Sequence, residues 1–153
     1  MIPPAVLWVN PSPTTGLAAL WGSGTSFWCD QLPWDEAASR IEWWCQRWQA
    51  LLAVGWETYK IDVSLPQHQA NAAIEMIGVA RRYATVYRCL ILPEGPRQTP
   101  KTPDRLLLEA LGWWVPGKKE AQKAANHLLK WMIRSQNMTP AVAAVVSEAA
   151  GSL

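Results

Sequence analysis

The chain has 153 residues, half of them hydrophobic and 17% charged, which predicts one compact domain with a single core and excludes a disordered chain. Its formal net charge of +2 is too small for a dedicated binder of duplex DNA, so we expect at most weak contact with DNA. No apolar run is long enough to span a membrane, and the first residues lack the features of a secretion signal. We therefore expect a protein that is neither secreted nor embedded in a membrane.

The cysteines do not indicate a zinc site or a disulfide framework. Cys29, Cys45 and Cys89 lie far apart, and none belongs to a CxxC or Cys/His spacing. We interpret them as small buried side chains in a reducing compartment.

The N-terminal segment predicts three strands. Residues 5–10 are an apolar run that ends at a Pro-Ser-Pro turn, which is typical of a buried strand. Residues 16–21 and 25–29 flank the sequence Gly22-Ser23-Gly24, which favours a hairpin.

A helix, a strand and a second helix are expected next. We expect Asp35 to cap a helix that continues to about residue 50. A strand is expected within residues 54–63, and Pro66 is expected to open a helix that runs to about residue 83.

The remainder of the chain predicts one more strand and three helices. Residues 85–92 are rich in apolar and β-branched side chains, as in a strand, and residues 93–103 contain four prolines, as in a loop. The helices are expected at residues 104–111, where Gly112 is a natural C-cap, from after Gly117 to about residue 134, and in the apolar tail that follows Thr139-Pro140.

The element order predicts an α/β protein with a central mixed five-stranded sheet flanked by helices. Three consecutive strands favour an antiparallel meander, and the alternation of helix and strand that follows favours parallel strands. This is the element order of the RNase H-like fold. We expect residues 1–137 to form this domain and residues 138–153 to form a tail helix that docks on a partner.

Three segments spread over the chain carry a family resemblance. Residues 9–16 read Val-Asn-Pro-Ser-Pro-Thr-Thr-Gly, and Glu57 lies in the fourth expected strand. Residues 111–118 read Leu-Gly-Trp-Trp-Val-Pro-Gly-Lys and run into a helix that contains the His-Leu-Leu of residues 127–129. Together these segments resemble the RuvC-like Holliday junction resolvases of phages, within the RNase H-like superfamily.

The resemblance implies a metal site at four positions. RuvC-like nucleases resemble two-metal hydrolases, in which paired Mg²⁺ ions activate a water and stabilise the leaving oxygen. The family takes its ligands from an aspartate on the first strand, a glutamate on the fourth, and two positions one turn apart on the last helix. In this chain those positions are occupied by Asn10, Glu57, Glu120 and Lys123.

These four residues predict a degenerate site. Two carboxylates, one amide and one ammonium have a formal charge of −1, and the ammonium of Lys123 repels a divalent cation. We therefore expect no catalytic residue, no bound metal and no other cofactor; if Mg²⁺ is held, Glu57 and Glu120 are its candidate ligands. Asp62 is a poor substitute, because it lies five positions after Glu57 and such an odd offset is expected to place it on the other side of the strand.

An active enzyme is the alternative. Asn10 could be an engineered or tolerated replacement of a natural aspartate, in which case the chain is a Mg²⁺-dependent endonuclease that resolves Holliday junctions. An engineered substitution does not explain Lys123, since lysine is an unusual choice for an inactivating substitution. Lys123 could instead pair with Glu57 or Glu120 and replace the metal as a counter-ion.

Other residues that could suggest chemistry have simpler interpretations. His127, on an apolar helix, is interpreted as a packed structural histidine, and His68, in a polar segment, as an exposed one. Ser12, Thr14 and Thr15 have no base at a useful spacing, so we interpret them as turn residues.

The tryptophan content favours a binding role. Eleven tryptophans are more than a domain of this size can fully bury, and tryptophan is enriched at protein interfaces. The side chains expected to contact a partner are Trp113, Trp114, Val142, Val145 and Val146. The predicted function is that of a catalytically degenerate phage protein, either a virion structural protein that is associated with or decorates the capsid, or a binding module. We expect it in the virion or the host cytoplasm, as an oligomer or part of a larger assembly.

Overall fold

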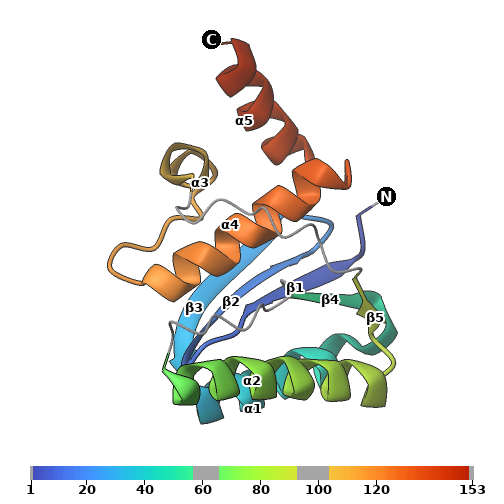
Figure 1. Cartoon of the computed structure of the whole chain (residues 1–153). Coiled ribbons are helices and arrows are strands. Elements are labelled where there is room, and N and C mark those ends of the chain that lie inside the picture. Colours follow the sequence, from blue (N-terminus) through green and yellow to red (C-terminus); the bar gives the residue numbers. More distant parts are fainter. Residues whose placement is uncertain (1, 57–65, 93–103, 152–153) are drawn as a thin grey trace.

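The computed structural model describes residues 2–56, 66–92 and 104–151. Within these ranges, one five-stranded sheet in the order β3-β2-β1-β4-β5 lies between two layers of helices (Figure 1). β1 (Ala5–Asn10) pairs antiparallel with β2 (Thr14–Trp21), which pairs antiparallel with β3 (Ser26–Pro33). β4 (Leu52–Trp56) and β5 (Leu90–Ile91) extend the sheet on the other side of β1 as parallel strands. The predicted α/β fold with an antiparallel meander and parallel strands is confirmed.

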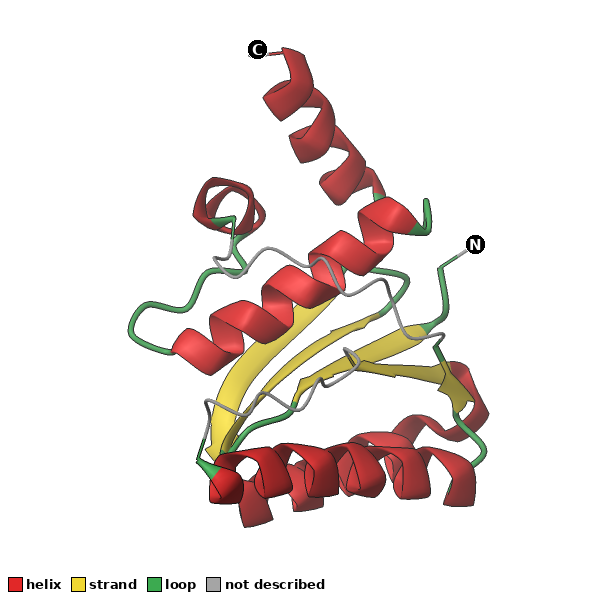
Figure 2. Ribbon diagram, viewed as in Figure 1, coloured by secondary structure: helices red, strands yellow, loops and turns green. Residues whose placement is uncertain are grey.

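The two helical layers have separate cores. α1 (Trp34–Trp48) and α2 (Gln67–Val86) cover one face of the sheet, and α1 is followed by the short 3-10 helix η1 (Gln49–Leu51). α4 (Lys119–Arg134) lies along the other face, with α3 (Arg105–Leu111) and α5 (Pro140–Gly151) beside it (Figure 2). No helix of the described ranges is long and apolar enough to cross a membrane.

The alternation of side chains along β1 determines which layer each residue faces. Leu7 and Val9 belong to the core under α1 and α2, whereas Val6 and Trp8 belong to the core under α4. Because successive residues of a strand point to opposite faces, Asn10 at the end of β1 points to the α4 side. This places Asn10 on the same side of the sheet as the last large helix.

Two predicted boundaries were wrong. Asp35 does not cap α1: the helix begins at Trp34 with Pro33 at the N-cap position, and no side chain caps it. Asp35 lies instead in the first turn, where its negative charge interacts favourably with the helix dipole. The strand expected at residues 85–92 shrinks to Leu90–Ile91, because α2 continues to Val86 and keeps Ala84 at helical spacing against the sheet.

The ends of α3 and the start of α5 agree with the sequence patterns. Asp104 Oδ1 accepts a hydrogen bond from the backbone N–H of Leu107, and Gly112 adopts a φ of 74° at the C-cap. The expected tail helix is present as α5. Its first turn is part of the domain core, since Val142 is fully buried beside α3 and α4.

Candidate functional site

The N-terminus of α4 lies directly on the sheet next to the end of β1. Asn10 pairs in register with Gly16 of β2, and a Cβ atom added to Gly16 would lie 2.0 Å from the backbone oxygen of Glu120. Only glycine therefore permits this close approach of helix and strand. The approach brings the side chain of Glu120 to that of Asn10.

Three of the four positions predicted from the family resemblance meet at this point. The amide Nδ2 of Asn10 donates a hydrogen bond to Oε2 of Glu120 at 2.6 Å. The ammonium Nζ of Lys123 lies 3.7 Å from Oε1 of the same carboxylate, one helical turn away. The two oxygens of Glu120 thus face an amide donor and a cation. Glu57 and Asp62 lie outside the described residues.

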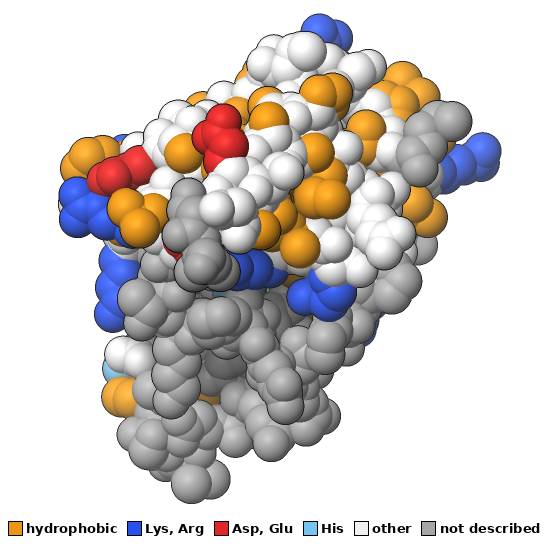
Figure 3. Space-filling view, turned by 90° about the horizontal axis from the view of Figure 1, so that it is seen from above, with side chains coloured by type: hydrophobic (Ala, Val, Ile, Leu, Met, Phe, Trp, Pro, Cys, Tyr) orange, Lys and Arg blue, Asp and Glu red, His pale blue; other side chains and the backbone are white. Residues whose placement is uncertain are grey.

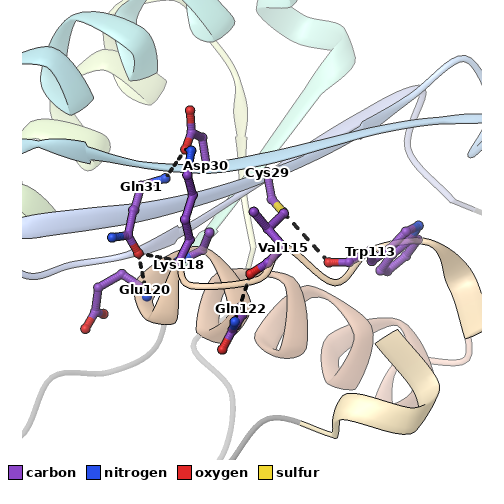
Figure 4. A network of polar contacts seen from close by, with 9 residues as sticks. Cys29, Asp30, Gln31, Trp113, Val115, Lys118, Glu120 and Gln122 are labelled. Carbon is purple, nitrogen blue, oxygen red and sulfur yellow. Dashed lines mark hydrogen bonds and ion pairs between the residues drawn. The ribbon is translucent and has the colours of Figure 1, made fainter. Parts of the chain in front are cut away.

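The first turn of α4 is held to the edge strand β3. Oε1 of Gln31 accepts hydrogen bonds from the backbone N–H groups of Glu120, at 2.9 Å, and Ala121, at 3.4 Å. Beside them, Nζ of Lys118 donates to Oδ1 of Asp30 at 2.6 Å, so two side chains of β3 anchor the helix start (Figure 4). Neither Gln31 nor Asp30 was predicted from the sequence to contact α4. The one pattern that bears on Gln31 is strand alternation, which places it on the same face of β3 as Cys29, two residues before it.

The charges at this anchor shift two pKa values. Burial alone would raise the pKa of Asp30, but the hydrogen bond from Lys118, the backbone N–H of Gln31 and the charge of Arg40 together hold it below 3.8. Burial and the neighbouring carboxylate of Asp30 raise the pKa of the Cys29 thiol to about 11, against the opposing effect of Lys118. Cys29 is therefore a neutral thiol, and its Sγ donates to the backbone oxygen of Trp113 at 3.9 Å.

All three cysteines are free thiols. Cys45 is buried, and burial raises its pKa, followed in effect by the neighbouring Cys89. Cys89 is half-buried, its pKa is also raised by burial, and its Sγ donates to the backbone oxygen of Cys45 at 3.9 Å. A buried, protonated thiol matches the interpretation of Cys45 as a structural side chain.

The described residues do not fit a Mg²⁺ site. Mg²⁺ takes oxygen ligands in near-octahedral geometry and is held in proteins mainly by carboxylates. Within the described ranges there is no group of three or more His, Cys, Asp or Glu side chains that could hold a metal. At the expected position, the Glu120 carboxylate is engaged by Asn10 and Lys123 instead.

The remaining polar residues near the site have structural contacts. His127 of α4 is nearly buried, and its ring stacks on Trp8 at a centroid distance of 6.3 Å, as expected for a packed histidine. His68 is exposed, also as expected. Oγ1 of Thr15 donates to the backbone oxygen of Ser12 at 2.7 Å, which is turn chemistry.

Two of the five predicted partner residues are buried inside the domain. Trp113 is only 6% exposed because its ring stacks on Phe27 at 4.3 Å, and Val142 is fully buried. Trp114, Val145 and Val146 are half-buried. Seen from the end where α5 projects, hydrophobic side chains form several separate groups and not one continuous patch (Figure 3).

The tryptophans divide between core and surface in an unexpected way. Five are buried, namely Trp8, Trp44, Trp56, Trp113 and Trp131. Trp43 of α1 is the most exposed, with half of its surface accessible, and it lies on the sheet face opposite to the predicted partner residues. Its position on the polar side of an amphipathic helix was not singled out from the sequence.

Comparisons with known proteins support the fold. No family model matches the chain, and no curated protein sequence matches it significantly. The fold is similar to that of Thermus thermophilus RuvC in complex with a Holliday junction substrate, with a TM-score of 0.56 and 15% identity over 86% of this chain and 95% of that chain. Another structure of Thermus thermophilus RuvC has a TM-score of 0.48 and 17% identity, over 86% of this chain and 96% of that one. The chain has the RuvC-like, RNase H-like fold that the sequence predicted.

Proposed function

We propose that this chain is a RuvC-like domain that does not cleave phosphodiester bonds and acts by binding a partner. The observation that carries the proposal is the contact of Asn10, Glu120 and Lys123. The hydrogen bond of 2.6 Å and the ion pair of 3.7 Å satisfy the Glu120 carboxylate without a metal. A side-chain amide and an ammonium thus stand where the resemblance implies metal-binding acids.

Electrostatics favours this interpretation over a weakened metal site. Two unit charges about 4 Å apart interact by about 4 kcal/mol at an effective dielectric of about 20, and a divalent ion doubles the repulsion from an ammonium. An ion beside Glu120 would have to displace Lys123 or accept that repulsion. Lys123 is 31% exposed, so solvent screening reduces the effect, but its sign remains unfavourable for Mg²⁺.

The partner that we favour is a virion protein. Support comes from the resemblance of residues 111–129 to phage RuvC-like proteins and from the many tryptophans. Mass spectrometry of purified particles of the virus that encodes the chain tests this part separately. Detection at a fixed copy number supports a structural role, and absence of the chain leaves a binding module that acts in the host.

An active junction-resolving endonuclease is the second candidate. It is favoured by the likeness to a RuvC structure that was solved with a Holliday junction substrate, of which this chain covers 95%. The two candidates differ in whether Glu57 and Glu120 can hold a metal despite Asn10 and Lys123.

Incubation with a four-way DNA junction and Mg²⁺ or Mn²⁺ distinguishes the two candidates. We expect no cleavage by the natural chain, with gel-shift binding of the same junction recorded in parallel. Metal-dependent cleavage that disappears in Glu57→Gln would establish the enzyme instead. The double variant Asn10→Asp, Lys123→Asp tests whether these two positions alone account for the proposed loss of cleavage. Recovered cleavage would show that they do.

A further inference from the structure

Two cysteines from distant parts of the sequence meet in the core under α1 and α2. Cys45 lies on the buried face of α1, and Cys89 lies between the end of α2 and the start of β5. Sγ of Cys89 donates to the backbone oxygen of Cys45 at 3.9 Å, and the two thiols are also hydrogen-bonded to each other. A disulfide joins two sulfurs at about 2.05 Å, so only a small rearrangement of the two side chains separates this contact from a covalent bond.

The chain beside this pair is held in place by two further hydrogen bonds. Oη of Tyr87 donates to Oε2 of Glu42 at 3.3 Å, which ties the turn after α2 to α1 just before Cys45. The backbone N–H of Cys89 donates to the backbone oxygen of Ala84 at 2.8 Å. The two thiols are therefore kept together by the fold around them.

The two thiols are not equivalent. Cys45 is fully buried, whereas Cys89 is half-buried and partly accessible to solvent. Burial raises the pKa of both thiols, but hydrogen bonds from the Cys45 thiol and from its own backbone N–H oppose the rise at Cys89. At Cys45, the interaction with Cys89 raises the pKa further. Cys89 is therefore the thiol that ionises first, and the thiolate is the nucleophilic form of cysteine.

We propose that Cys45 and Cys89 are a site of reversible oxidation, at which hydrogen peroxide forms a disulfide between α1 and the segment before β5. The Cys89 thiolate attacks one oxygen of the peroxide, the O–O bond breaks, and the leaving hydroxide takes up the proton that Cys89 released. The product at Cys89 is a sulfenic acid. The sulfur of Cys45 then attacks that of Cys89, the S–O bond breaks, and the hydroxyl leaves as water with the proton of Cys45. Two thiols and one peroxide thus become one disulfide and two waters.

Cys29 is not part of this site. Its side chain packs in the core under α4, on the other face of the sheet from Cys45 and Cys89. Its Sγ donates to the backbone oxygen of Trp113 instead. The oxidation site is also separated by the sheet from the contact at the start of α4, so it can be tested whether or not that contact excludes a metal.

Peptide mapping of the whole purified chain after peroxide treatment tests the proposal. The reduced chain is exposed to hydrogen peroxide, blocked with iodoacetamide and digested under non-reducing conditions. We expect a crosslinked pair of peptides that contains Cys45 and Cys89, in a chain that still migrates as a monomer in a non-reducing denaturing gel. Dithiothreitol should remove the crosslink. The oxidised chain should unfold roughly 5 °C or more above the reduced chain, because the crosslink restricts the unfolded state.

Variants distinguish this site from unspecific oxidation. Cys29→Ser is the matched control and is expected to form the same crosslink. Cys89→Ser should lose the crosslink, and Cys45→Ser should accumulate a sulfenic acid at Cys89 that dimedone traps; circular dichroism confirms that each variant is folded. Sulfoxide at the exposed Met138 shows that enough peroxide was present. The proposal is overturned if Met138 is oxidised while Cys45 and Cys89 remain unlinked, or if the crosslink contains Cys29.

Discussion

A hydrogen bond of 2.6 Å from Asn10 to Glu120 links the end of β1 to the start of α4. An amide can donate to a carboxylate, whereas an ionised aspartate at the same place cannot. The sequence indicated that positions 10, 120 and 123 would lie together, because the resemblance placed them in one site. It also offered an ion pair of Lys123 with Glu120, which the structure has at 3.7 Å. It could not indicate the hydrogen bond from Asn10, since this depends on how closely α4 approaches β1.

Asn10→Asp is expected to destabilise the natural chain at neutral pH. It places a second carboxylate against Glu120 and removes the donor, which we expect to cost about 1 kcal/mol, because both side chains are only partly buried. The loss should shrink at acid pH, where a protonated carboxyl again donates. Urea unfolding at both pH values measures it, with the exposed residue change Asn71→Asp as control. If Asn10→Asp were as stable as the unchanged chain at neutral pH, the hydrogen bond from Asn10 to Glu120 would not contribute to stability, and this account would be contradicted.

Gly16→Ala tests the close approach of α4 to β2. The added Cβ meets backbone atoms of Glu120, which cannot move aside as a flexible side chain can. We expect a loss of about 1–3 kcal/mol from overpacking. Gly78→Ala is the matched control: nothing lies within 4 Å of its added Cβ, and alanine within α2 should stabilise the chain by about 1 kcal/mol. If Gly16→Ala and Gly78→Ala changed the free energy of unfolding in urea equally, glycine at position 16 would not be needed for the contact between α4 and β2.

At the scale of elements, α4 is positioned by side chains far away in the sequence. Gln31 caps its first turn from 89 residues earlier, and Asp30 pairs with Lys118 beside it. The helix itself could be predicted from its apolar spacing and from Pro116-Gly117 before it. Its anchors could not, because an edge strand shows only alternation in its sequence and not which helix end it meets.

The pair of Asp30 and Lys118 predicts a dependence of stability on pH. The folded pKa of Asp30 lies below 3.8, so the pair contributes stability above that pH and loses it as the pH falls through the folded pKa. Lys118→Met should therefore be less stable than the natural chain near neutral pH. The difference should close as the pH falls through the folded pKa of Asp30 and its carboxylate becomes protonated. Thermal unfolding across this pH range measures the difference. A difference that stays constant with pH would show that Lys118 stabilises the chain by packing of its aliphatic stem and not by its charge.

The strand expected at residues 85–92 shows where local preference fails. Thr85 and Val86 are β-branched, yet they end α2, because Ala80 and Ala84 continue its contact with the sheet. The chain then turns through Arg88 with a φ of 61° before the two residues of β5. Packing of the helix against the core outweighs the weak propensity of two residues.

At the scale of the whole molecule, the order of elements was sufficient to predict the fold. Three strands followed by alternating helices and strands leave few ways to bury both faces of a sheet. The surfaces were harder to predict. Trp113 and Val142 were expected to meet a partner but complete the core under α4, whereas Trp43 on the opposite layer is exposed. Composition shows that tryptophans exceed the needs of a core, but not which of them do.

Two layers with separate roles follow from this arrangement. The layer of α4 contains the mutual contacts of Asn10, Glu120 and Lys123, and the layer of α1 contains the half-exposed Trp43. The sheet separates the two layers, so a change on the outer face of α1 need not alter the α4 side.

Direct titration of the chain with Mn²⁺, followed by electron paramagnetic resonance of the free ion, tests the proposed loss of the metal site most directly. Lys123 and Asn10 satisfy the Glu120 carboxylate, so we predict no saturable binding to the natural chain at millimolar Mn²⁺. Saturable binding of one or two ions that is abolished by Glu120→Gln would contradict the account, because it would show that the amide and the ammonium yield to a metal.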